Sequence, residues 1–265
     1  MKIQFRYAYL TDKGIRPINQ DFVQVLSETE NGAGYDIEHC GALFAVADGV
    51  GGHQAGEVAA RMAGEGLAQY YADARAREVA TRQTVLQEVF AEINRAVFRK
   101  SVSANEFFGM GTTLTVMVVS DENGGTAHIA HIGDSRIYRL RGDELAMLTR
   151  DHTEVQKLVD KGELTLEQAK TYSRSQWLTE AIGAEPQLET LYERVEPVLP
   201  GDRYLLCTDG LSNHLSDEQI KQTLRARTTP ARACERLLQR ALKAGSQDNL
   251  TALVIQVKPA GRSAR

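Results

Sequence analysis

Leu43-Phe44-Ala45-Val46-Ala47 is an apolar run that leads into Asp48-Gly49, and this stretch decides the fold. The same pattern returns where Tyr204-Leu205-Leu206-Cys207-Thr208 leads into Asp209-Gly210. Asp-Gly after a strand is typical of a hairpin turn, but the residues that follow do not alternate like a returning strand. A loop and a helix are predicted after each step instead. The pattern therefore predicts a carboxylate at the end of a buried strand, beside a glycine that allows close approach to the backbone.

Three further aspartates stand at the ends of predicted apolar strands. Asp134 follows the run that ends at Gly133, Asp248 precedes the run Leu250–Val257, and Asp21 opens the strand Asp21–Leu26. Each by itself is typical of a turn residue. If these aspartates only solvated the protein surface, we would not expect five of them to stand at the ends of apolar strands.

Clustered carboxylates repel one another, so bringing them together requires a counter-cation. Oxygen ligands without cysteine favour Mg²⁺ or Mn²⁺ over zinc. His53 and His131 lack the H-E-x-x-H spacing of a zinc site. A histidine such as His131, on a strand, is more typical of a core position.

The rest of the chain predicts strands around helices in a single domain, 1–257. Residues 152–183 lose strand alternation and are predicted as an irregular insertion with short helical pieces at Thr153–Lys161, Thr165–Lys170 and Gln176–Ile182. Residues 258–265 predict a disordered basic tail. Further strands are predicted at Ile3–Leu10, Thr112–Val119, Thr126–Ile132, Arg136–Leu140, Glu144–Leu148 and Asp202–Cys207, and helices at Ala55–Ala74, Arg82–Lys100, Ser216–Arg225 and Ala231–Lys243.

Composition excludes several classes of protein. The 265 residues carry 31 Lys+Arg against 35 Asp+Glu, a formal net charge of -4 that does not suit a nucleic-acid binder. No apolar run is long enough to span a bilayer, and the N-terminus lacks the apolar region of a signal peptide. The cysteines, Cys40, Cys207 and Cys234, form no C-x-x-C pair and predict neither a disulfide framework nor a zinc site. We therefore expect a cytoplasmic protein.

Six strings of residues, in order along the chain, are similar to one known family. The chain resembles the bacterial branch of the metal-dependent type 2C Ser/Thr protein phosphatases from about Gly14 to Val257. The strings are Gly14-Ile15-Arg16 with Asn19-Gln20-Asp21, Ala47-Asp48-Gly49-Val50-Gly51-Gly52-His53 with Gly56-Glu57, Gly111-Thr112-Thr113, His131-Ile132-Gly133-Asp134-Ser135-Arg136, Cys207-Thr208-Asp209-Gly210-Leu211, and Asp248-Asn249-Leu250-Thr251.

The resemblance implies an α+β fold in which two packed antiparallel β-sheets are flanked on both sides by α-helices, with a metal centre in a cleft at one end. It implies two Mn²⁺ or Mg²⁺ ions in the core site and a third, weaker one. Asp48 would bridge two ions and the Gly49 carbonyl would bind one of them. Asp209 and Asp248 would complete the shell of the second ion, and Asp134 would hold the third with Asp209.

The same resemblance implies roles for other residues. Asp21 would order metal-bound water, and Arg16 would bind the substrate phosphate, which suits a planar guanidinium. His53 is a candidate general acid, although hydrogen bonding within its loop explains it equally well. The insertion 152–183 falls where the family carries a flap beside the active site. Many relatives place Glu where this chain has Gln20, so we expect any metal contact there to be water-mediated or absent.

The implied activity is the hydrolysis of phosphoserine and phosphothreonine in proteins by direct attack of a metal-bridging water, without a phosphoenzyme. A bacterial enzyme of this type would reverse the action of a Ser/Thr kinase. Because the sequence contains no heptad pattern, we expect a monomer. Two alternatives stay open: a binding module of the same fold that recognises phosphoproteins without turnover, and a metal-dependent phosphodiesterase or nuclease. The second would need a basic channel, which the composition does not supply.

Overall fold

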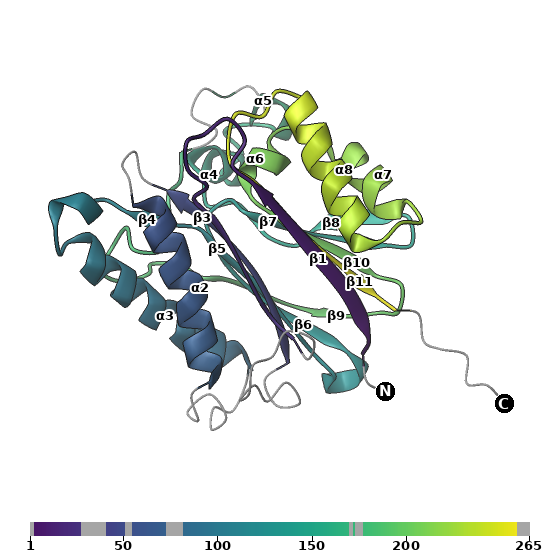
Figure 1. The fold of residues 1–265 in the computed structure, drawn as a ribbon, viewed down its shortest axis with the longest axis horizontal. Coiled ribbons are helices and arrows are strands. Elements are labelled where there is room, and N and C mark those ends of the chain that lie inside the picture. The colour runs from purple at the N-terminus through teal and green to yellow at the C-terminus, as the bar shows by residue number, and fades with distance from the viewer. Residues whose placement is uncertain are drawn as a thin grey trace.

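The computed structural model describes residues 3–27, 41–50, 55–72, 82–169, 172 and 177–258. Two antiparallel sheets pack face to face, with helices on the outer face of each (Figure 1), which confirms the predicted α+β sandwich. The first sheet has the order β1 (Phe5–Asp12), β11 (Leu250–Val257), β10 (Arg203–Cys207), β7 (Arg136–Arg141), β8 (Glu144–Met147). The second has the order β2 (Asp21–Leu26), β3 (Ala42–Val50), β5 (Leu114–Ser120), β6 (Thr126–Ile132), β9 (Tyr192–Pro197), and β4 (Gly111–Thr112) pairs with the end of β3.

Two pairs of helices cover the sandwich. α2 (Gly56–Ala72) and α3 (Arg82–Ser101) pack on the second sheet, while α7 (Asp217–Arg225) and α8 (Pro230–Lys243) pack on the first, on the opposite side of the molecule (Figure 1). The shorter helical elements are η2 (Asn105–Phe107), η3 (Glu122–Gly124), α4 (Glu154–Asp160), α5 (Leu166–Ala169) and α6 (Asp209–Ser212). Within the described residues, no helix combines the length and apolar composition needed to cross a membrane.

The strand side chains alternate between two cores because both faces of each sheet are covered. On β3, Phe44 and Val46 point between the sheets, where they meet residues such as Leu206 and Ile255. Leu43 and Ala45 on the same strand point outward beneath α2 and α3. This double burial explains why the strand reads as a continuous apolar run.

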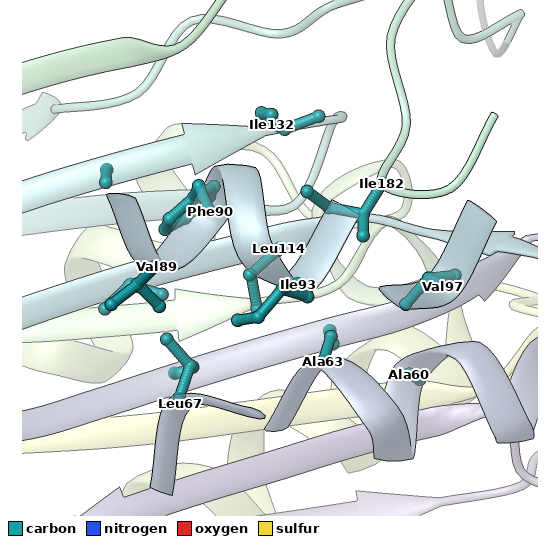
Figure 2. Packing of buried hydrophobic residues seen from close by; sticks show 14 of the residues in the cluster. Ala60, Ala63, Leu67, Val89, Phe90, Ile93, Val97, Leu114, Ile132 and Ile182 are labelled. Atoms are coloured by element: carbon teal, nitrogen blue, oxygen red, sulfur yellow. The ribbon is translucent and has the colours of Figure 1, made fainter. Parts of the chain in front are cut away.

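The outer core beneath α2 and α3 combines helix, strand and insertion residues. Figure 2 shows α2 and α3 side by side above the strands, with Ile182 from the end of the insertion reaching the same cluster. Gly66 lets α2 approach α3 closely, because a Cβ there would lie 2.8 Å from Ile93 Cγ1. The labelled members are Ala60, Ala63 and Leu67 from α2, Val89, Phe90, Ile93 and Val97 from α3, and Leu114 and Ile132 from the sheet.

The structure differs from the sequence prediction in several elements. β3 continues through Asp48-Gly49 to Val50, because β4 pairs with its end. Asp209 begins the short helix α6, where we expected a loop. Residues 177–182 are not helical; Ile182 forms a β-bridge with Thr112 instead. Strand β9 was not predicted, since its alternating polar sequence carries a weak strand signal.

Candidate metal and phosphate site

Asp21 and Asp48 stand directly opposite each other on β2 and β3. The backbone of Asp48 is held by the Gly-Thr-Thr motif: its N–H donates to Thr113 Oγ1 at 2.9 Å, and its carbonyl accepts from Thr113 N and Thr112 Oγ1, both at 2.9 Å. These hydrogen bonds fix the carboxylate position through the backbone, so the motif serves to place Asp48.

Gly49 and Gly56 allow the start of α2 to lie against the end of β3. A Cβ on Gly49 would lie 2.3 Å from the carbonyl carbon and oxygen of Gly56, which no side chain could tolerate. A Cβ on Gly56 would lie 2.8 Å from both the Gly49 oxygen and Gln20 Nε2. The close approach leaves the backbone beside Asp48 free of side chains.

Asp209 and Asp248 are brought together by backbone contact. Thr208 is the N-cap residue of α6 and Asp209 is its first residue. A Cβ on the next residue, Gly210, would lie 2.0 Å from the carbonyl oxygen of Asn249, so only glycine fits there. Ser246 Oγ also donates to the Gly210 carbonyl at 2.8 Å. The glycine of this Asp-Gly step is therefore required for α6 to pack against the residues that precede β11.

Asp21 is held at one carboxylate oxygen only. Its Oδ2 accepts from Thr208 Oγ1 at 2.9 Å and from Thr251 Oγ1 at 2.6 Å. Its Oδ1 is buried without a hydrogen-bond partner. Burial raises the pKa of Asp21 to about 7, although both threonine bonds lower it. An unpartnered buried carboxylate oxygen indicates that a further group belongs beside it.

The aspartates act on one another electrostatically. Burial raises the pKa of Asp48, and repulsion from Asp21, Asp209, Asp134 and Asp248 raises it further. Burial and neighbouring carboxylates also raise the pKa values of Asp134 and Asp209. The side chain of Asp48 acts in the opposite sense and lowers the pKa of Asp209. The five aspartates singled out in the sequence thus interact at one end of the sandwich.

The loop that carries Asp134 is tied to the start of the insertion. His152 N donates to the Gly133 carbonyl at 2.7 Å, and Gly133 N donates to His152 Nδ1 at 3.2 Å. Arg136 pairs with Asp151 at 2.6 Å. His131 lies in the core as expected, fully buried beside Thr115, and its pKa falls to about 3 because of burial.

Arg16 lies beside this cluster. Its Nη2 is 2.8 Å from Asp248 Oδ2, and the two side chains are 55% and 42% exposed. A guanidinium in this position can reach solvent and carries the charge that a phosphate requires. His53 lies outside the described residues.

A comparison with known families and proteins agrees with this geometry. Residues 18–253 match the family model described as protein phosphatase 2C. The chain belongs to the protein phosphatase 2C family.

Several bacterial Ser/Thr phosphatases are similar to this chain. It is 36% identical to Serine/threonine protein phosphatase PstP of Mycobacterium tuberculosis over 254 residues, which are 95% of this chain and 45% of PstP. It is 32% identical to Serine/threonine phosphatase stp of Listeria innocua, covering 97% of this chain and 96% of that one. It thus spans about half the length of PstP and nearly all of the Listeria protein.

Among solved structures, it is similar to the PstP catalytic domain crystallised with two manganese ions. The TM-score is 0.78 at 35% sequence identity, and the match covers 97% of this chain and 100% of that one. The manganese ions belong to that crystal structure.

The donor set of this type 2C phosphatase fits hydrated hard cations. The unpartnered Oδ1 of Asp21 and the mutual repulsion of the aspartates both call for positive charge. Among the described residues, no three His, Cys, Asp or Glu side chains come close enough to enclose an ion by themselves. The proposed ligands are carboxylate and carbonyl oxygens, which suit hard ions such as Mg²⁺ and Mn²⁺ better than zinc.

Sequence reasoning missed several residues that support the site. Thr208 and Thr251 hold Asp21, and Asn249 ties the Arg16 loop to β11. Thr208 directly precedes Asp209 and Thr251 follows Asp248 by three positions, so their place within the motifs was a usable signal. The tie between His152 and Gly133 had no sequence signal, because it joins residues on separate segments.

Proposed function

We propose that this type 2C phosphatase removes phosphate from phosphoserine and phosphothreonine in proteins, with Mn²⁺ or Mg²⁺ as cofactor and by direct attack of water. The observation that carries the proposal is the convergence on Asp48: four other aspartates, each from a different segment, raise its pKa. Such a concentration of negative charge is costly unless cations occupy it, and a phosphate substrate also needs cations.

In this proposal, Asp48 and the Gly49 carbonyl, together with Asp209 and Asp248, would hold two ions, and Asp134 with Asp209 would hold a third, weaker one. Bound ions of this kind lower the pKa of water and neutralise charge on the phosphoryl oxygens. Each of these aspartates belongs to a motif anchored by backbone hydrogen bonds or close glycine contacts, so the carboxylates are preorganised.

Arg16 binds the substrate phosphate in this proposal, and its partly exposed guanidinium supports that role. Bound cations would take over the role of counter-charge to Asp248, which would leave the Arg16 guanidinium available to the phosphate. Asp21, anchored by Thr208 and Thr251, would order metal-bound water. The candidate general acid for the leaving alkoxide is His53. The flap 152–183, joined to the Asp134 loop through His152, influences substrate selection.

Asp209→Asn tests the proposal. The amide keeps the size of the side chain but loses the charge, so we expect hydrolysis of p-nitrophenyl phosphate and of a phosphothreonine peptide with Mn²⁺ to fall at least about 100-fold. Excess EDTA should abolish wild-type hydrolysis, and added Mn²⁺ should restore it.

The matched control is Asp143→Asn, which removes an exposed carboxylate from the β7–β8 turn, outside the aspartate cluster, and should leave both rates unchanged. A wild-type protein that hydrolyses neither substrate at any Mn²⁺ or Mg²⁺ concentration would contradict the proposal. Binding of the phosphopeptide without turnover would then favour the binding module.

We further propose that residues 1–257 form one catalytic domain that acts as a monomer in the cytoplasm and reverses the action of a bacterial Ser/Thr kinase. The strands at the two ends of this range, β1 and β11, pair with each other in one antiparallel sheet, which supports a single domain. Free, buried Cys207 and Cys234 suit a reducing compartment. Size-exclusion chromatography with light scattering tests the monomer, and dephosphorylation of an autophosphorylated kinase from the same cell tests the partner.

A further inference from the structure

The loop that carries Arg16 exposes apolar side chains on both sides of it. Ile15 is 72% exposed and Ile18 is 46% exposed. In the described part of the chain, only Phe108 is more exposed than Ile15 among the large apolar residues. A single exposed apolar residue is ordinary. Here two of them flank the proposed phosphate ligand, and we call them the Ile15–Ile18 ledge.

The ledge is displayed by a loop that is firmly anchored. Asn249 Nδ2 donates to the carbonyls of Lys13 and Ile18, both at 3.0 Å. Gly14 has a φ of +58°, and a Cβ there would lie 2.3 Å from the Asp248 carbonyl oxygen. The backbone on both sides of Ile15 is therefore pressed against the β11 entry. The loop is thus held in place while the side chains of Ile15 and Ile18 are exposed to solvent.

The anchoring also sets the ledge beside the aspartate cluster. Arg16 Nη2 lies 2.8 Å from Asp248 Oδ2, and in Figure 1 the loop after β1 lies next to the connection between α8 and β11. Consecutive Cα atoms are 3.8 Å apart in any chain. When the phosphate of a peptide contacts Arg16, the residues directly before and after the phosphorylated residue therefore come close to Ile15 and Ile18.

We propose that the Ile15–Ile18 ledge binds an apolar side chain next to the phosphoserine or phosphothreonine of the substrate, so that this phosphatase prefers phosphosites flanked by apolar residues. The inference rests on the proposed function and names the substrate class for the same site. The ledge offers water-exposed apolar area that a substrate side chain can cover, and its coverage should raise kcat/KM about tenfold.

The test compares two phosphothreonine peptides that differ only in the residues directly before and after the phosphothreonine, Leu in one and Ser in the other. We expect the wild-type chain with Mn²⁺ to give a ratio of kcat/KM near ten in favour of the Leu peptide. Ile15→Ser combined with Ile18→Ser should reduce this ratio to between one and two, mainly through KM. Ile15→Val should preserve most of it.

The matched control is Val195→Ser on β9, the edge strand of the second sheet that lies opposite β2. The Val195 side chain is 53% exposed. This variant should leave the ratio near ten. A wild-type ratio near one, or an unaltered ratio in the double variant, would overturn the proposal, and the first of these needs no variant. Hydrolysis of p-nitrophenyl phosphate separates the two levels. A wild-type chain that hydrolyses it without a peptide preference refutes the ledge alone. A chain that hydrolyses neither it nor either peptide, at any Mn²⁺ or Mg²⁺ concentration, refutes the proposed function and the ledge together.

Discussion

The buried carboxyl group of Asp21 lowers the folding stability of the metal-free protein at neutral pH. Two threonine hydroxyls bind its Oδ2, while its Oδ1 stays buried without a partner. Burial raises its pKa to about 7, whereas an aspartate in an unfolded chain titrates near 4. The folded protein without metal therefore holds a proton that the unfolded chain has released between about pH 4 and pH 7. Its stability falls as the pH rises through that window.

Asp21→Asn should weaken this pH dependence. Asn can accept both threonine bonds and carries no charge, so we expect the metal-free variant to exceed wild type in unfolding free energy at pH 7.5 by about 1–3 kcal/mol. At pH 4 the two should be nearly equal. Urea unfolding in EDTA at several pH values measures the slope, and Asp143→Asn is the control for removing a carboxylate. Equal slopes in wild type and Asp21→Asn would contradict the assignment.

At the scale of elements, a single buried side chain joins the β1–β2 connection to β11. Asn249 is 5% exposed; besides donating to Lys13 and Ile18, it accepts from Gln20 N at 2.8 Å. The loop between β1 and β2 thus depends on a residue more than 200 positions away in the sequence. In contrast, α7 is defined locally, by a capping box between Ser216 and Gln219.

Asn249→Ala should therefore affect both stability and substrate binding. Loss of three buried hydrogen bonds should cost about 2–4 kcal/mol of unfolding free energy. It should also raise the KM for a phosphopeptide more than it lowers kcat, because Arg16 loses its fixed position. The control is Ser216→Ala, which removes a helix cap and should cost about 1 kcal/mol without changing KM. A stability loss with unchanged KM in Asn249→Ala would show that the clamp does not position Arg16.

The whole molecule is held together by the core between its sheets. Phe44 on β3 meets Phe5 and Tyr7 on β1 of the other sheet, with ring centroids 5.3 and 5.5 Å apart in edge-to-face geometry. Aromatic pairs of this kind add to the free energy of area burial. Because the aspartates come from both sheets, with Asp21 and Asp48 on one and Asp248 at the end of the other, the sandwich must close before the site exists.

Phe44→Ala should accordingly destabilise the molecule as one unit. We expect a loss of about 3–5 kcal/mol in unfolding free energy, with near-UV circular dichroism and phosphatase activity lost in the same urea transition. Phe44→Leu keeps most of the volume and should cost less than half as much. Activity lost well before the core unfolds would show that the site opens independently of the sandwich.

The sequence by itself determined the strands and helices whose signals are local. The apolar run of β3, the strands β2 and β11 and the helix α7 follow from neighbouring residues, and the structure contains all of them. The motif aspartates could also be found from the sequence, because each stands close to the end of an apolar strand.

Only the tertiary structure decided what depends on contact between distant segments. The extension of β3 to Val50 requires pairing with β4, and the polar strand β9 exists because β6 offers it an edge. The Asn249 clamp joins segments that are distant in sequence, as does the pairing of Thr208 and Thr251 with Asp21. A hydrogen bond between such segments depends on how the whole chain packs, whereas strand alternation and helix caps depend on a few consecutive residues.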